Sequence, residues 1–414
     1  MQAGTLKNVI ERTEEISAAR MDSTRSVSLT EAMQDAPGVI VANECSMCGY
    51  KRIQLNGLKA EHTNIIIDGM PTHTILSGFY AVDAIATTGV ERIEVARGAG
   101  ASLTAPEAIG GVVNVVTYES LQNELNLDVG AGQYGFQQVG LLGTIASDSG
   151  NIRTTIVAQI DDRDQFDADG NGVSENPLLE NRIASARISW DASSRDNVIF
   201  RLGHAQQEMF GGPMIGDTVG SIAEAVASES LGEAPQLFVG DDVRNRWIGN
   251  PWETTEWVDT QRFETSGRWL RELNDDWNMT LSASLATHEQ DSYYEGFDYA
   301  ADDDMLYLDA RFNYSVGDKH LLTFGTDSRT EEMRSRSIAG EVANNDGDPD
   351  TIYVADSFDY DVRGFYIQDS FNVTDSLELQ MAMRFDQVEA DFTDPSKPGT
   401  EIDRSIVSPR FDMR

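Results

Sequence analysis

The chain has 414 residues, enough for two or more domains, and 40% of them are hydrophobic, so it can bury a core. Its formal net charge of −38 argues against a nucleic-acid partner, because phosphate binding requires a surplus of Lys and Arg. That charge fits either a surface that meets cations or a salt-adapted proteome, and the sequence leaves both open. No run of about 18 apolar residues occurs, so the sequence contains no transmembrane helix.

The N-terminal part has the pattern of a mixed α/β domain. Residues 1–9 lack the apolar core of a secretory signal, so an export signal is expected upstream of them. Ser28, with Glu31 three residues later, predicts a capped helix start, and Pro37-Gly38 predicts the helix end. Short strands separated by glycine-containing turns are predicted next, at residues 53–55, 65–67, 93–95 and 112–116.

From residue 121 onward the pattern changes to long strands, of which we count about 12. In residues 277–285, 306–315 and 377–386, apolar side chains alternate with polar or charged ones. A soluble β-sandwich also alternates, with its polar face outward. Strands of about ten residues or more are, however, long enough to cross a bilayer on a tilt.

The connections between these strands favour a membrane barrel over a sandwich. Tight turns are predicted at residues 148–151, 193–196, 274–276, 317–319 and 374–376. Longer connections alternate with them, at residues 166–181, 211–259, 297–303, 338–358 and 391–403, whereas the first one, near 133–135, is short. A membrane barrel has short turns at its periplasmic rim and long loops at its external rim, and a soluble sandwich has no reason to keep that alternation.

Five segments of the first 120 residues resemble the plug domain of TonB-dependent receptors, in the family's order and spacing. They are residues 29–39, 53–58, 65–71, 90–98 and 108–117. Receptors of this family take up ferric siderophores, cobalamin and other scarce nutrients. The resemblance implies an α+β plug domain, residues 1–120, inside an antiparallel transmembrane β-barrel, residues 121–414, in the outer membrane of a Gram-negative bacterium.

The sequence departs from the family pattern in three places. The N-terminal TonB box, which couples such receptors to the inner-membrane energy complex, is missing, and the barrel has about 12 of the 22 strands expected of the family. Residues 104–107 read Thr-Ala-Pro-Glu where the family usually has a Tyr-Gly-Ser-like run. We therefore expect a fragment whose sheet cannot close.

The resemblance implies energised uptake of a metal chelate, siderophore or cobalamin-type ligand, with no enzymatic step. The expected partners are the TonB energy-transducing complex, outer-membrane lipid and that ligand. A passive porin or adhesin-like barrel is the alternative, although a plug would block passive flow. A metal-binding enzyme is a third hypothesis, but nothing in the sequence supplies a general base beside its cysteines.

The most distinctive plug segment contains the chain's two cysteines, Cys45 and Cys48, and a subset of the family's plugs has a similar Cys-x-x-Cys-Gly motif. Two thiolates at this spacing can bind a soft metal such as copper or zinc, or they can form a disulfide in the oxidising envelope. Both alternatives stay open. The candidate ligand contacts at the plug apex are Cys45, Met47, Cys48, His62 and His73.

An acidic segment in the second external loop resembles a calcium-binding loop. Asp167, Asp169 and Asn171, followed by glycine, match the alternate oxygen ligands of such a loop. The glutamate expected at the last position is replaced by Leu178, for which Asp162, Asp164 and Glu175 can compensate. The segment therefore predicts either a Ca²⁺ site or a solvated acidic turn.

Two further groups of side chains are candidates for contacts in the lumen or with ligand. The long loop 211–259 contains Arg244, Arg246, Trp247 and Trp252, which suit either a grip on an aromatic or macrocyclic chelate or a girdle at the membrane interface. The plug strand 90–98 contains three charged residues that the barrel would enclose: Arg92, Glu94 and Arg97. Either solvent or inward-facing barrel acids such as Asp309, Glu378 and Asp386 are expected to compensate them.

Overall fold

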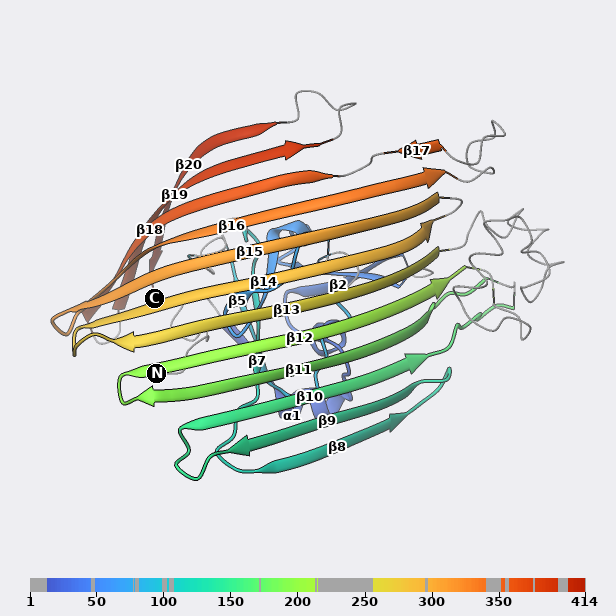
Figure 1. Ribbon diagram of the computed structural model, residues 1–414, viewed down its shortest axis with the longest axis horizontal. Helices are drawn as coiled ribbons and strands as arrows, with labels where there is room; N and C mark the ends of the chain where they lie inside the picture. Colours follow the sequence, from blue (N-terminus) through green and yellow to red (C-terminus); the bar gives the residue numbers. More distant parts are fainter. Residues whose placement is uncertain are drawn as a thin grey trace.

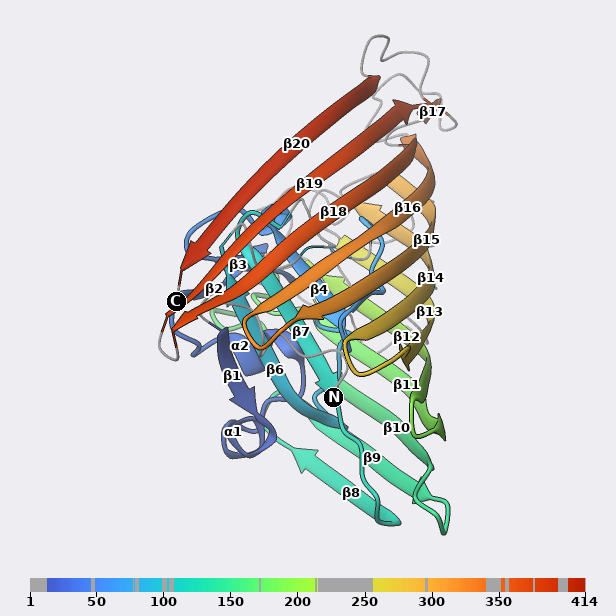
Figure 2. The ribbon, with the colours of Figure 1, turned by 90° about the vertical axis from the view of Figure 1, so that its left-hand side faces the viewer.

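The structure is a computed structural model that describes residues 13–45, 49–76, 78, 82–98, 103, 108–170, 173–212, 214, 256–294, 297–339, 351–353, 357–374, 377–393 and 401–413. These residues form a large curved antiparallel sheet, the wall, and a smaller α/β unit, the plug, on its concave side (Figures 1 and 2). Among the helices described, none has the length and hydropathy needed to cross a membrane.

The plug contains a five-stranded sheet, a two-stranded hairpin and short helices. The sheet has the order β1-β6-β7-β4-β5, in which only the β4–β7 pair is parallel. Its strands are β1 Thr13–Ser17, β4 Thr63–Ile67, β5 Met70–Pro71, β6 Val90–Arg97 and β7 Gly111–Thr117. The hairpin pairs β2 Val39–Cys45 with β3 Tyr50–Leu55, and the helices are α1 Ala18–Thr24, α2 Leu29–Met33 and the 3₁₀ turn η1 Ala60–His62.

The capped helix predicted at Ser28 is confirmed as α2. The Ser28 hydroxyl accepts the Glu31 backbone N–H at 3.5 Å, and the Glu31 carboxylate in turn accepts the Val27 N–H at 2.9 Å. Helix α2 buries Leu29 and Met33 against the central sheet strands in one apolar cluster. The short strands predicted from 53 to 116 are confirmed as well, whereas β1 and α1 were not predicted.

The wall confirms the twelve long strands, which follow one another in chain order as an open sheet. They are β8 Glu124–Ala131, β9 Gln137–Ala146, β10 Ile152–Arg163, β11 Leu178–Ser193, β12 Asp196–Gly211, β13 Glu256–Glu272, β14 Trp277–Tyr294, β15 Phe297–Val316, β16 His320–Ala339, β18 Phe358–Thr374, β19 Leu377–Phe392 and β20 Ile402–Met413. The short β17, Thr351–Tyr353, pairs with β16 off this path.

One predicted long connection is wrong. Residues 297–303 belong to β15, and β14 reaches Tyr294, so two residues at most separate the two strands. Here Asp298 and Asp302 face outward while Tyr299 and Ala301 continue the inward face, in register with β14. The apolar alternation that identifies a wall strand is lost at this end of β15, because the outward-facing side chains here are acidic. The segment therefore resembled a loop in the sequence.

The wall has the reverse of the usual distribution of polarity. On β15, Leu306 and Leu308 face outward and are 40% and 47% exposed, whereas Asp303 and Asp309 face inward and are buried. Equivalent exposed apolar side chains occur on the neighbouring strands, including Leu285 on β14 and Phe365 on β18. A wall that is apolar outside and polar inside suits lipid on one side and an enclosed plug on the other.

This arrangement predicts a dependence on depth for outward-facing charges on β15. Leu308→Arg should destabilise the assembled barrel by about 2–4 kcal/mol, because it places a charge in the apolar band. Asp302→Arg is the matched control on the same face of the same strand, and it should cost about 0–1 kcal/mol because it lies beyond that band. Urea unfolding of the receptor in lipid vesicles measures the loss of stability in both variants. Equal losses would contradict the placement of Asp302 beyond the apolar band.

Candidate ligand-binding site

An aromatic pocket lies between the plug and the wall, at the end of the sheet where β14 meets β15 and opposite the turn at residues 274–276. Its volume is about 690 Å³. The plug contributes Ile75 and Leu76, and the wall contributes inward-facing side chains from β14 to β20: Gln290, Tyr294, Tyr299, Met333, Phe358, Tyr360, Ala390, Phe392 and Ile402. None of these lining side chains carries a charge, so the pocket offers an apolar and aromatic surface to an occupant.

The pocket exists because adjacent strands place aromatic residues at the same height on the inward face. Phe358 lies opposite Phe392 in the β18–β19 register, and their rings meet edge to face with centroids 6.4 Å apart. Tyr294 and Tyr299 form a second ring pair at 6.3 Å. From the plug side, Leu76 packs against Ala301 and Met333 of the wall.

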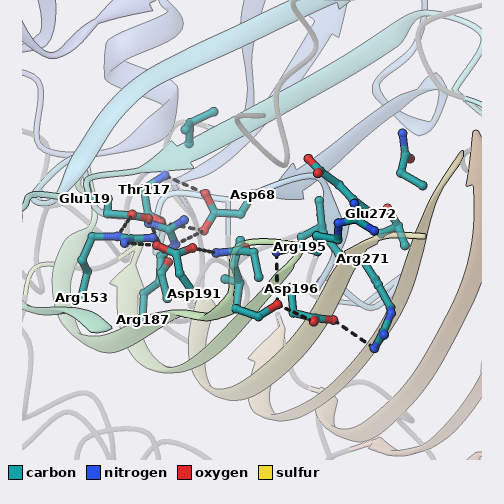
Figure 3. Close-up of a pocket in the computed structure, with 18 of the residues that line it drawn as sticks. Asp68, Thr117, Glu119, Arg153, Arg187, Asp191, Arg195, Asp196, Arg271 and Glu272 are labelled. Carbon is teal, nitrogen blue, oxygen red and sulfur yellow. Dashed lines mark hydrogen bonds and ion pairs between the residues drawn. The ribbon is translucent and has the colours of Figure 1, made fainter. Parts of the chain in front are cut away.

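A second cavity of about 700 Å³ lies at the other end of the lumen, beside the tight turn at residues 193–196 (Figure 3). Its charged side chains already compensate one another. Glu119, in the linker between plug and wall, pairs with Arg153 and Arg187, and it accepts the Ser189 hydroxyl at 2.9 Å. Arg187 also lies 3.7 Å from the Asp68 carboxylate of the plug.

The electrostatics of this cavity favour an ionised Glu119. Burial alone would raise the pKa of Glu119, but Arg187, together with the hydrogen bonds from Ser189 and Arg153, lowers that pKa below its usual value. The Asp68 carboxylate is held in turn by the Thr117 N–H at 2.9 Å and the Thr117 hydroxyl at 2.6 Å. These contacts tie the end of the plug to the wall and leave the cavity polar.

The disulfide is one of the two alternatives predicted for the cysteine motif, and Cys45 is disulfide-bonded in the structure. Met47 and Cys48 lie outside the described residues. Cys45 ends β2, and Gly49, just beyond the tip of the hairpin, has a φ of +65° and approaches Pro177 and Met209 of the wall. A sulfur held in a disulfide is not available as a thiolate ligand.

The two predicted histidine contacts lie elsewhere in the plug. His62 ends η1, and its carbonyl accepts the Gly110 N–H at 2.8 Å. His73 is buried against the wall, where burial and then Arg262 lower its pKa to about 3, so its imidazole is neutral. Neither histidine is among the side chains that line the aromatic pocket.

The acidic loop brings together three carboxylates. Ligand atoms of Asp167, Asp169 and Glu175 lie within 4.8 Å of one another, and over the described ranges this is the one such group of three or more His, Cys, Asp or Glu residues. Asn171 lies outside the described residues. The Gly170 N–H donates to Asp167 at 2.7 Å, as in an ordinary acidic turn.

The plug charges find partners that differ from those expected. Arg92 pairs with Glu94 of its own strand at 2.9 Å, and Arg97 pairs with Glu14 of the unpredicted strand β1 at 2.5 Å. The barrel acids named for this role are engaged within the wall, since Asp309 accepts the Tyr366 hydroxyl at 2.6 Å and Asp386 pairs with Arg384. Glu378 lies in β19.

The candidate contacts of the long loop, Arg244, Arg246, Trp247 and Trp252, lie outside the described residues. The aromatic pocket itself was not predicted from the sequence. A usable signal was present, since Phe358, Tyr360 and Phe392 occupy inward positions of the alternation next to predicted long connections. That signal does not reveal that Ile75 and Leu76 of the plug complete the pocket.

Two family models match the chain. The model described as "TonB-dependent Receptor Plug Domain" matches residues 5–112, and the one described as "TonB dependent receptor-like, beta-barrel" matches residues 216–414. The vitamin B12 transporter BtuB of Photobacterium profundum is 31% identical over 149 residues, which cover 35% of this chain and 24% of that protein. The probable TonB-dependent siderophore receptor PirA of Acinetobacter baumannii is 23% identical over 393 residues, which cover 86% of this chain and 49% of PirA.

Solved structures share the fold. The ferric preacinetobactin receptor BauA of A. baumannii has a TM-score of 0.72 at 13% identity, with 100% of this chain and 63% of BauA covered. The ferric yersiniabactin uptake receptor FyuA of Yersinia pestis has a TM-score of 0.68 at 12% identity, with 98% of this chain and 61% of FyuA covered. The chain thus spans between about a quarter and three fifths of the length of these proteins.

The two family models, the plug enclosed by an open antiparallel wall and the inverted polarity of that wall all agree with the resemblance found in the sequence. The chain belongs to the TonB-dependent receptor family, whose members are outer-membrane β-barrel proteins of Gram-negative bacteria.

Proposed function

We propose that this chain is the plug and first half of the barrel of a receptor that takes up a cobalamin-type or siderophore-type chelate by energised transport. Residues 1–120 act as the plug and residues 121–414 as the wall. Ligand binds in the aromatic pocket, the TonB complex pulls on the plug, and the ligand passes inward with no bond broken. The observation that carries the proposal is a pocket floored by the plug itself, at the end of the lumen opposite the turn at residues 274–276.

The chemistry of the pocket narrows the class of ligand. Its described lining is aromatic and aliphatic apart from Gln290, so the face of the ligand that enters it is uncharged and apolar. Relatives with 31% and 23% identity are described as a vitamin B12 transporter and a probable siderophore receptor, and both kinds of compound can present such a face. We therefore propose a large chelate with an exposed macrocyclic or aromatic surface.

A passive porin is disfavoured by how the plug is held. Arg268 donates to the Asp68 carbonyl at 2.5 Å, the Ser284 hydroxyl donates to the Pro71 carbonyl, and Arg384 donates to the Leu103 carbonyl at 2.6 Å. These bonds join the plug to three different wall strands. A plug fixed in this way obstructs the lumen until work is done on it.

Energised uptake gives the primary test. Cells that carry the full-length receptor should accumulate labelled vitamin B12 or ferric yersiniabactin, and accumulation should cease when the proton gradient is discharged or TonB is deleted. Binding of the same compound to the cell surface should continue, because binding needs no energy input. Uptake that persists without the gradient would instead support a passive barrel.

Truncation of the pocket should weaken recognition. Tyr360→Ala and Phe392→Ala should each raise the half-saturation constant for uptake about tenfold, since loss of an aromatic contact with the ligand costs about 1–2 kcal/mol. Phe365→Ala is the matched control, because Phe365 is on the same strand as Tyr360 but faces outward and is 60% exposed. Equal effects of Tyr360→Ala and Phe365→Ala on half-saturation would refute the pocket assignment.

The cysteine motif should act as a structural element and not as a metal ligand. Cys45→Ser, alone or with Cys48→Ser, should leave the copper and zinc content of the purified receptor unchanged, because the Cys45 sulfur is already bonded. Cleavage of the hairpin by protease should become faster, since the tip loses its cross-link. Loss of bound metal in the variants would revive the metal-site alternative.

A further inference from the structure

A short plug loop is held to the wall through consecutive backbone amides. It follows β5, and its residues Thr72, Thr74 and Leu76 are at most 8% exposed. The Leu76 N–H donates to the Asp303 carboxylate at 2.9 Å, and the preceding Ile75 N–H donates to the Glu331 carboxylate. We call these two amides and two carboxylates the carboxylate clamp.

The two carboxylates of the clamp come from neighbouring wall strands. Asp303 on β15 and Glu331 on β16 face inward on adjacent rungs of the ladder, and both are completely buried. Arg329 pairs with Glu331 at 2.6 Å and also donates to the His73 carbonyl of the loop at 3.5 Å. Burying two acids side by side is costly. Arg329 compensates the charge of Glu331, and the two plug amides add a hydrogen-bond donor to each carboxylate.

The clamped residues are also the plug's contribution to the aromatic pocket. The side chains of Ile75 and Leu76 line the pocket, while Asp303 and Glu331 do not. Leu76 packs against Ala301 and Met333, which flank the clamp on the same two strands. An occupant of the pocket therefore touches the side chains of the two residues whose amides the wall holds.

We propose that Asp303 and Glu331 are positioning residues, which fix the Ile75–Leu76 segment as the floor of the aromatic pocket without touching the ligand. Releasing the clamp lowers the fraction of receptor whose loop is in the binding-competent position. The apparent affinity falls in proportion to that fraction, because receptors with a displaced loop must reorder it before they bind ligand. The part of this inference that concerns affinity rests on the proposed function, whereas the clamp itself does not.

Hydrogen–deuterium exchange of the detergent-purified full-length receptor tests the clamp directly. In Asp303→Leu and Glu331→Leu the amides of residues 72–76 should exchange roughly tenfold faster, because each variant leaves one buried N–H without its acceptor. Asp303→Asn should keep exchange slow, since the carboxamide oxygen still accepts. The outward-facing Asp304→Leu is the matched control and should have no effect on this loop.

Uptake kinetics of the same variants test the positioning role. With vitamin B12 or ferric yersiniabactin, whichever the receptor carries, the leucine variants should raise half-saturation roughly tenfold at an unchanged maximal rate per assembled receptor. Asp303→Asn should restore the wild-type constant, whereas a purely structural role would lower only the amount of assembled receptor.

The outcomes separate the two proposals. Unchanged exchange in both leucine variants would overturn the clamp. Faster exchange with unchanged half-saturation would overturn the positioning role. If neither compound is carried while exchange rises as expected, the proposed function fails and the clamp stands.

Discussion

Within a bilayer the backbone has no water to bond with, so every strand that crosses must hydrogen-bond to a neighbour along its length. The wall satisfies this from β9 to β19, where each strand pairs on both sides, and β8 and β20 each keep one unpaired edge within the described sheet. The same constraint fixes the polarity. Side chains alternate across a paired strand, so an apolar face toward lipid leaves the opposite face to meet the plug.

The inward face creates the second physical problem, because it places ionisable groups in an enclosed lumen. The structure compensates them locally. Arg384 lies between Asp327 and Asp386 on the wall, and Arg92 lies between Glu91 and Glu94 on the plug. Contacts that cross from plug to wall are made largely by backbone groups of the plug, as at Asp68, Pro71 and Leu76. Some wall residues serve both purposes, since Arg384 pairs with two acids and also donates to the Leu103 carbonyl of the plug.

The sequence was informative wherever local pattern decides structure. Capping predicted α2 from Ser28 and Glu31, and the strand pattern predicted about twelve wall strands. In residues 277–285, 306–315 and 377–386 the alternation also predicted which side chains share the apolar face. It failed where pattern was weak or misleading: β1 contains a single apolar residue, Ile16, and the acids at 298 and 302 made part of β15 look like a loop. The aromatic pocket joins Leu76 to Met333, and the ion pair of Arg97 joins it to Glu14. These residues are far apart in the chain, and no single-sequence pattern links them.

The hydrogen bonds between plug and wall have a consequence for the plug movement that the proposed function requires. A backbone hydrogen bond to a wall carboxylate or arginine can be exchanged for one to water at a small net cost, because each group stays bonded in both states. An apolar junction would instead expose hydrophobic surface on separation, and the exposed surfaces would adhere wherever they next met. Under the proposed function, a junction held by polar contacts would therefore let the plug leave and return to the same register.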